Sequence, residues 1–183
     1  MIAKETSLEG NFLVNLELNN DERGFFARFF CVKEFSNYGM NTSWVQINNS
    51  MSKSLGTLRG LHFQRSPNAE VKLVRCLRGV IWDVVVDLRK GSETFGKWFG
   101  ATLSDENRTM MYVPKGFAHG FISLEPDSEI LYLVSDFYAP EAERTLLWND
   151  PDVGIQWPIQ PQVLSDKDLQ GRLLSDISHL ELD

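Results

Sequence analysis

The 183-residue chain has few cysteines, few histidines and no excess of positive charge. Its two cysteines, Cys31 and Cys76, lack the spacing of metal ligands, so we expect both to be buried free thiols. The net charge of −7 argues against a general nucleic-acid binder, since such proteins neutralise phosphates with clustered Lys and Arg. A single anionic ligand is compatible with this charge, because an acidic protein can carry a local basic pocket.

The sequence also lacks several segments and motifs that would assign it to a class. It has no charged-then-apolar leader and no run approaching the roughly 20 apolar residues of a membrane span. We therefore expect a cytoplasmic protein that does not contact a membrane. A G-x-S-x-G nucleophile turn is absent, and so are the glycine-rich loops that bind the phosphates of dinucleotides and nucleoside triphosphates.

What the chain does contain is a series of short β-type segments. At this length, with 43% hydrophobic residues, we expect a single domain over residues 1–183 with a sizeable core. Residues 1–20 read as an edge strand followed by a turn at 19–21, and 31–41 as a short helix ended by Gly39. The tail, 166–182, could supply another helix. Strands are predicted at 44–50, 57–64, 71–77, 80–88, 97–103, 110–113, 120–124 and 129–137, a spacing typical of an all-β sandwich or barrel.

Two of the three histidines lie in apolar segments marked by glycine. They are His62 in LRGLHFQ and His119 in VPKGFAHGF, whereas His179 lies in a polar tail and is expected at the solvated surface. Taken singly, a histidine on an apolar strand is more often a core residue than a catalyst. Because the positions two residues from His62 are Gly60 and Gln64, the two histidines fall short of the usual three protein ligands of a transition metal. We expect no metal site.

The remaining chemistry is a histidine base, a tyrosine acid and fixed cations that hold an anion. Tyr132 lies on the predicted strand 129–137 and shares a face with Val134, Asp136 and Tyr138; the alternative is that it fills the core and bonds its hydroxyl to a partner. Arg59 and His62 fall on opposite faces of a regular strand. Gly60 between them could mark a bulge that re-aims one side chain. The alternative for Arg59 is a remote carboxylate partner.

Together these segments resemble the nucleotide-sugar 3,5-epimerases of the cupin superfamily, typified by dTDP-4-dehydrorhamnose 3,5-epimerase. The similarity runs from DERGF at 21–25 to Lys167-Asp168. Its markers, in family order, are Gln46, Asn48, GTLRGLHFQ at 56–64, Lys72, Asp83, Asp87-Leu88-Arg89, PKGFAHGF at 114–121, Tyr132, Tyr138 and WNDPDVGIQWP at 148–158. The resemblance implies a cupin-type jelly roll (a double-stranded β-helix) that forms a homodimer. It also implies that the N-terminal part reaches across to the partner, and that there is no metal or organic cofactor.

The resemblance also implies roles for individual residues. His62 is the expected general base, Tyr132 the acid on the opposite face of the sugar, and Asp168 the carboxylate that orients His62. The other groups are expected to bind the substrate. Arg59, Lys72 and His119 would surround the sugar and its enolate. Arg23 and Arg59 would bind the diphosphate, and Tyr138 would stack on the nucleobase. Further contacts with the substrate would come from Gln46, Asn48, Glu143 and Lys167.

One position departs from the family pattern. Two residues after Arg23-Gly24-Phe25-Phe26 the family commonly has a glutamate, where this chain has Arg28. Because this position contributes to substrate binding in the family, the reversed charge leaves the identity of the nucleotide and of the sugar undecided. The alternative is that Arg28 simply turns to solvent or pairs within the dimer. The leading hypothesis is inversion of C3 and C5 of dTDP-4-dehydro-6-deoxy-D-glucose. The alternatives are a C3-only or C5-only epimerase on another nucleotide-linked 4-keto sugar, a non-catalytic sugar-nucleotide binder, and a metal-dependent cupin enzyme.

Overall fold

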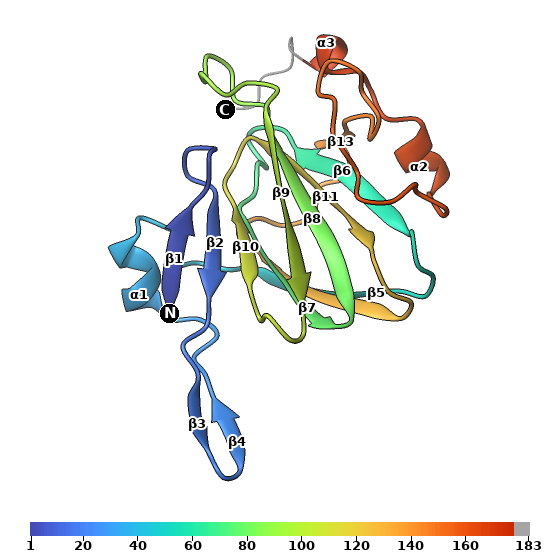
Figure 1. The fold of residues 1–183 in the computed structure, drawn as a ribbon. Helices are drawn as coiled ribbons and strands as arrows, with labels where there is room; N and C mark the ends of the chain where they lie inside the picture. The colour runs from blue at the N-terminus through green and yellow to red at the C-terminus, as the bar shows by residue number, and fades with distance from the viewer. Residues whose placement is uncertain (178–183) are drawn as a thin grey trace.

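Two β-sheets face each other in the computed structural model, which describes residues 1–177 (Figure 1). The six-stranded sheet has the order β1-β2-β10-β7-β12-β5, formed by Ile2–Glu5, Phe12–Asn15, Met110–Val113, Lys72–Arg78, Ser128–Val134 and Gln46–Ser52. The five-stranded sheet has the order β13-β6-β11-β8-β9, formed by Glu143–Thr145, Leu58–Gln64, Phe117–Ser123, Val80–Asp87 and Trp98–Ser104. This is the predicted all-β jelly roll of the cupin type.

The described residues also contain a separate hairpin and three short helices. Strands β3 (Asn19–Asp21) and β4 (Gly24–Phe26) pair only with each other and extend away from the two sheets (Figure 1). The helices are α1 (Val32–Asn37), α2 (Asp166–Leu169) and α3 (Leu174–Ile177). None of the helices in residues 1–177 is long and apolar enough to cross a membrane.

Three clusters of buried side chains hold the layers together. Val74 of β7 and Val85 of β8 belong to the cluster between the sheets. Their neighbours Leu73 and Val84 point outward, where α1 covers the first sheet and the C-terminal segments cover the second. Strands covered on both faces are apolar throughout, which explains the uninterrupted β-branched run in β8. Each such buried side chain contributes about 1.5–3 kcal/mol of transfer free energy.

The predicted strands are found with small shifts at their ends. Strand β11 begins at Phe117, three residues earlier than predicted, and β13 was not predicted. Strand β12 ends at Val134 because the chain turns at Ser135, whose Oγ accepts a hydrogen bond from the Val71 amide at 2.8 Å. The prediction that Asp136 continues the face of Tyr132 is therefore wrong.

The N-terminal and C-terminal predictions need larger corrections. Residues 19–21 form strand β3 rather than a turn; the turn lies at Glu22-Arg23, because Asp21 pairs with Gly24. The edge strand is β1, and the alternating segment of β2 is sheltered between β1 and β10. The tail forms two short helices, and His179 lies outside the described residues. Both cysteines are free; Cys76 is buried, but Cys31 is only half-buried, contrary to prediction.

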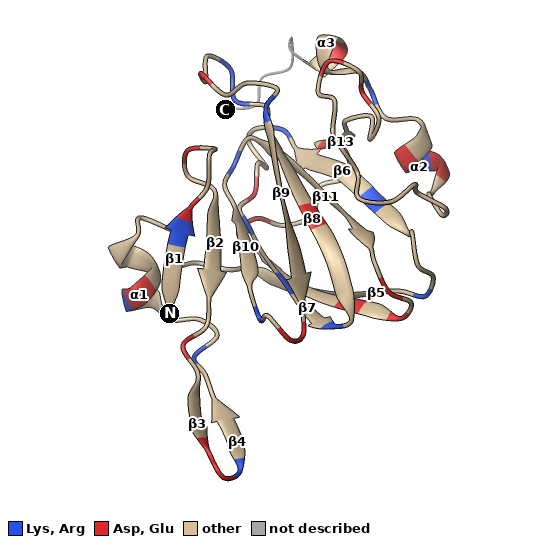
Figure 2. Cartoon of the chain, viewed as in Figure 1, with Lys and Arg blue, Asp and Glu red and all other residues tan. Residues whose placement is uncertain are grey.

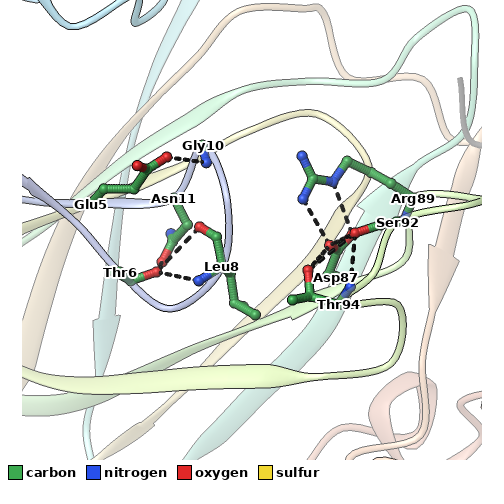
Figure 3. A network of polar contacts seen from close by, with 9 residues as sticks. All are labelled: Glu5, Thr6, Leu8, Gly10, Asn11, Asp87, Arg89, Ser92 and Thr94. Atoms are coloured by element: carbon green, nitrogen blue, oxygen red, sulfur yellow. Dashed lines mark hydrogen bonds and ion pairs between the residues drawn. The ribbon is translucent and has the colours of Figure 1, made fainter.

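Asp87, one of the residues that mark the family resemblance, stabilises the fold and does not line the cleft described below. The Asp87 carboxylate at the end of β8 is completely buried and accepts hydrogen bonds from Arg89 Nε (3.0 Å) and Nη2 (2.8 Å), and from the Ser92 and Thr94 hydroxyls (2.6 Å each; Figure 3). Burial by itself would raise the pKa of Asp87, but these contacts outweigh burial and lower it. An ionised Asp87 therefore fastens the loop between β8 and β9.

Candidate active site

A cavity of about 480 Å³ opens between the two sheets. A second cavity, of about 280 Å³, shares His62, Lys72, Tyr132 and Glu143 with the first, so the two form one cleft. Eleven of the twelve predicted site residues line this cleft. Arg59, His119, Lys167 and Asp168 line the larger cavity, Gln46, Asn48 and Tyr138 line the smaller one, and the four shared residues line both.

The predicted bulge at Gly60 brings Arg59 and His62 into the same cavity. His62 lies opposite His119 and Arg59 lies opposite Phe121, so strand β6 has one more residue than β11 between these pairs. Without the extra residue, Arg59 and His62 would point to opposite faces. Arg59 donates a hydrogen bond to the Met51 carbonyl at 3.2 Å and has no carboxylate within ion-pair distance in residues 1–177. It is a cation available to an anionic ligand.

His62 and Asp168 form the predicted pair. His62 Nε2 lies 2.6 Å from Asp168 Oδ1, on helix α2, and the Asp168 side chain is only 4% exposed. Burial would raise the pKa of Asp168, but contacts with His62, Ser165 and the Gly60 N–H more than offset burial and lower it. An ionised carboxylate only accepts hydrogen bonds, so Nε2 carries the proton and Nδ1 is free to accept one.

Tyr132 faces this pair from the other sheet. It lies on β12 and lines both cavities, while His62 lies on β6. Its ring packs against the core cluster between the sheets, but its hydroxyl makes no hydrogen bond to any described residue, so the partner expected by the core-filling alternative is not found there. Burial raises the pKa of Tyr132, the charges of Glu70 and Glu143 raise it further, and Arg59 opposes them. The hydroxyl is therefore protonated at neutral pH and can act as an acid.

His119 has a carboxylate partner that the sequence analysis did not assign to the site. Its Nε2 lies 2.9 Å from Asp83 Oδ2. Asp83, on β8, is fully buried, and its Oδ1 has no hydrogen-bond partner among the residues that the structure describes. The available signal was an acidic residue inside the apolar run IWDVVV, since a carboxylate on a buried strand needs a partner. The cleft thus contains two histidine–carboxylate pairs side by side.

Asp83→Asn should lower kcat by about 10- to 100-fold, because the amide no longer fixes which His119 nitrogen carries the proton. The fold should be retained, since the substitution is isosteric and removes a buried charge. Steady-state kinetics and thermal unfolding of the same preparation would check this. Wild-type kcat in the variant would show that Asp83 has no influence on the reaction.

Two lysine–glutamate pairs line the cleft. Lys167 pairs with Glu143, which also accepts a hydrogen bond from the Tyr138 hydroxyl at 2.9 Å. Burial would raise the pKa of Glu143, but Lys167 and Tyr138 outweigh burial and lower it. Lys72 lies 3.2 Å from Glu70, a second residue that the sequence analysis missed. The exposed ring of Tyr138 stands at the entrance.

Arg23 is the one predicted site residue that lies away from the cleft. It occupies the tip of the β3–β4 hairpin, where both signs of charge occur (Figure 2), and it pairs with Asp21. Arg28 is also outside the cleft; its Nη1 lies 3.0 Å from Glu34 Oε1 on α1 of the same chain. Among residues 1–177, no three His, Cys, Asp or Glu side chains are grouped so as to hold a metal ion.

Comparison with known proteins agrees with this geometry. The family profile described as dTDP-4-dehydrorhamnose 3,5-epimerase matches residues 5–176. The chain belongs to this epimerase family. A dTDP-4-dehydrorhamnose 3,5-epimerase of Pseudomonas aeruginosa is 49% identical over 178 residues, covering 96% of this chain and 97% of the relative.

Solved structures of epimerases extend the comparison to the fold. The Elizabethkingia anophelis dTDP-4-dehydrorhamnose 3,5-epimerase has a TM-score of 0.93 at 42% identity, covering 96% of this chain and 97% of the other. The Legionella pneumophila epimerase in complex with dTDP-4-keto-L-rhamnose has a TM-score of 0.90 at 39% identity, covering 98% and 97%. A 3′-monoepimerase from Streptomyces bikiniensis also matches, with a TM-score of 0.86 at 36% identity, covering 93% and 86%.

Proposed function

We propose that this protein is an isomerase that inverts C3 and C5 of dTDP-4-dehydro-6-deoxy-D-glucose, giving dTDP-4-dehydro-L-rhamnose. The observation that carries the proposal is the opposition of a base and an acid across one cleft. His62 stands on one sheet, paired with Asp168 of helix α2, and the protonated Tyr132 stands on the other sheet. A sugar ring between the sheets would present one face to each group.

The chemistry follows from the acidity of hydrogens beside a ketone. The 4-keto group acidifies the hydrogens on C3 and C5, provided that negative charge on the enolate oxygen is stabilised in the transition state. His62 Nδ1 would take the proton from carbon, while Lys72 would donate a hydrogen bond to the enolate oxygen, as would His119 when both of its ring nitrogens carry a proton. Tyr132 would return a proton to the opposite face. All these groups are side chains, so the proposed reaction needs no metal or organic cofactor.

The remaining cleft residues fit a nucleoside diphosphate. Arg59 has no acidic partner within residues 1–177 and suits the diphosphate, while the exposed ring of Tyr138 suits stacking on the nucleobase. Gln46, Asn48, Glu143 and Lys167 supply further polar groups along the smaller cavity. A charged nucleotide sugar does not cross a membrane unaided, so we place the enzyme in the cytoplasm with its substrate.

The proposal includes a homodimer of single-domain subunits. The hairpin that carries Arg23 also exposes Phe25 (48%) and Phe26 (66%), while the edge strand β5 exposes Ile47 (64%) and Met51 (48%). Apolar surface of this kind on a protruding hairpin and on an unpaired edge suits contact with a second copy. In such a dimer the hairpin of one subunit would bring Arg23 to the diphosphate end of the partner's cleft.

Mixing two inactive variants tests this arrangement. Arg23→Ala and His62→Ala homodimers should each turn over poorly at low substrate concentration, but subunit exchange between them should restore about one quarter of the wild-type sites. The restored site combines His62 of one subunit with the hairpin of the other. Activity would be followed before and after exchange, with each variant alone as control. If Arg23 acts on the cleft of its own chain, mixing restores nothing.

The reaction itself is tested by proton NMR of dTDP-4-keto-6-deoxyglucose with the protein in deuterated water. Loss of both the C3 and C5 proton signals, with a new sugar appearing, would establish the double epimerase. The second candidate is a mono-epimerase, for which Arg28 is the specific observation; exchange at one carbon alone would establish it. Binding without any exchange would identify a sugar-nucleotide binding protein.

A further inference from the structure

Glu70 is a partly buried carboxylate in the cleft to which the proposed mechanism gives no role. It precedes strand β7 by two residues and lines the smaller cavity together with Lys72 and Tyr132. The Glu70 and Lys72 side chains are 12% and 10% exposed, and Oε1 of Glu70 lies 3.2 Å from Nζ of Lys72. Removing a charged pair from water costs solvation free energy, and this cost is offset only when the two groups are held in close contact.

The backbone beside Glu70 is held firmly. The Val71 amide donates to Ser135 Oγ at 2.8 Å, and the Ser135 amide donates to the Val71 carbonyl at 3.0 Å. These two hydrogen bonds join the start of β7 to the end of β12, the strand that carries Tyr132. Glu70 therefore projects from a fixed point next to the acid of the proposed reaction.

Lys72 depends on Glu70 for its position. An ammonium group on a four-carbon stem is flexible and has three donors, and the contact with Glu70 uses only one of them. The remaining donors are free for the oxygen that becomes negative as a proton leaves carbon. Stabilisation of that oxygen requires a donor already fixed in place before the reaction.

We propose that Glu70 is a positioning residue of the epimerase, which holds the Lys72 ammonium group in the cleft where the enolate oxygen develops. This inference rests on the proposed epimerase function. Glu70 also bears on Tyr132, because its negative charge helps to raise the pKa of that hydroxyl after burial, the larger cause. The charged or titratable groups that share the cleft with Tyr132 are Arg59, His62, Glu70, Lys72, His119, Tyr138, Glu143, Lys167 and Asp168.

The test uses Glu70→Gln and Glu70→Ala, with Glu129→Gln as the matched control. Glu129 lies on β12 like Tyr132, but its carboxylate bonds to Asn49 at the exposed surface. We expect kcat of Glu70→Gln to fall about tenfold, because the amide holds an ammonium group less firmly, with a larger loss in Glu70→Ala. KM should change little, since Arg59 and Tyr138 bind the nucleotide end.

The pH profile separates positioning from a merely structural role. Tyr132 acts in its protonated form, so activity is lost as pH rises through its pKa. Removing the Glu70 charge lowers that pKa, and the alkaline limb of kcat should move to lower pH. NMR titration of ¹³C-labelled tyrosine, with Tyr132→Phe to assign the signal, should show the same shift without using activity.

Three outcomes would overturn the proposal. One is a kcat of Glu70→Gln equal to that of the control, whatever the tyrosine titration shows. Another is a lower kcat with an unmoved alkaline limb and an unmoved Tyr132 titration, which would make Glu70 a structural residue only. If the wild-type protein exchanges no carbon-bound hydrogen, the proposed function fails and the inference fails with it. An active wild type with unaffected Glu70 variants would leave the function standing.

Discussion

His62→Ala should lower the rate of hydrogen exchange at C3 and C5 by about 10³-fold, because the positioned base that removes the proton is gone. Inversion should fall by the same factor, since no enolate forms. Deuterium incorporation followed by NMR measures exchange and inversion in one sample. The fold should survive, because the His62 side chain is 28% exposed and faces the cavity. Exchange at the wild-type rate in this variant would remove His62 from the role of base.

Tyr132→Phe provides the complement to that experiment. His62 can still remove a proton and return a deuteron to the same face, so exchange should continue while inverted product becomes scarce. Tyr112→Phe is the matched control, because Tyr112 is a buried tyrosine whose hydroxyl accepts a hydrogen bond from the Asn41 amide outside the cleft. Equal loss of exchange and inversion in Tyr132→Phe would contradict the separation of roles between the two walls of the cleft, the β6 wall with the base His62 and the β12 wall with the acid Tyr132.

Gly60→Ala should destabilise the protein by about 3 kcal/mol or more and abolish activity in the folded fraction. Gly60 has a φ of +131°, and a Cβ atom there would lie 2.5 Å from Cα of Gly120 and 2.9 Å from the carbonyl oxygen of His119. Relief of these contacts must displace β6 from β11, which separates His62 from His119. Denaturant unfolding and kinetics of the soluble variant measure the two effects.

Gly24→Ala is the control that separates the effect of close contacts from the effect of backbone conformation in the stability lost by Gly60→Ala. Gly24 has a similar φ of +124°, but a Cβ atom there would meet no atom within 4 Å. Its cost should be that of the backbone conformation alone, about 1–3 kcal/mol. Equal losses of stability at the two glycines would show that close approach of β6 and β11 is not what requires Gly60.

The sequence predicted the fold class and most strands because the hydrophobic alternation and the turn residues agree along the chain. The failures lie where tertiary contacts overrule that local pattern. The polar segment of β1 forms a strand only because β2 offers it a partner, and 19–21 becomes a strand only because Gly24–Phe26 folds back on it. Strand β13 has three residues, too few for a periodic signal.

The site was predictable in part, for a different reason in each case. Gly60 between Arg59 and His62 was a local signal of a bulge, and the register confirms it. The contact of His62 with Asp168 spans 106 residues, and the resemblance alone suggested it. Asp83 was noted only as a marker of the resemblance, and Glu70 was not noted at all. A carboxylate can be recognised as a partner only when the strand that carries its cation is known to lie beside it. Arg23 lies on a hairpin away from the cleft, and only the proposed second subunit would bring it to a substrate.

The division of the cleft between two walls also bears on how epimerases with the same fold can invert either one carbon or two. In the proposed mechanism the proton is removed at the β6 wall, where His62 lies with Asp168 of helix α2 beside it, and a proton is returned at the β12 wall, where Tyr132 lies. The two walls belong to different sheets, so substitutions on one can accumulate without rebuilding the other. A 3′-monoepimerase with the same fold is what such independence permits. In this architecture, selectivity between single and double inversion can evolve by altering the access of Tyr132 to each carbon, while the proposed base on the β6 wall stays unchanged.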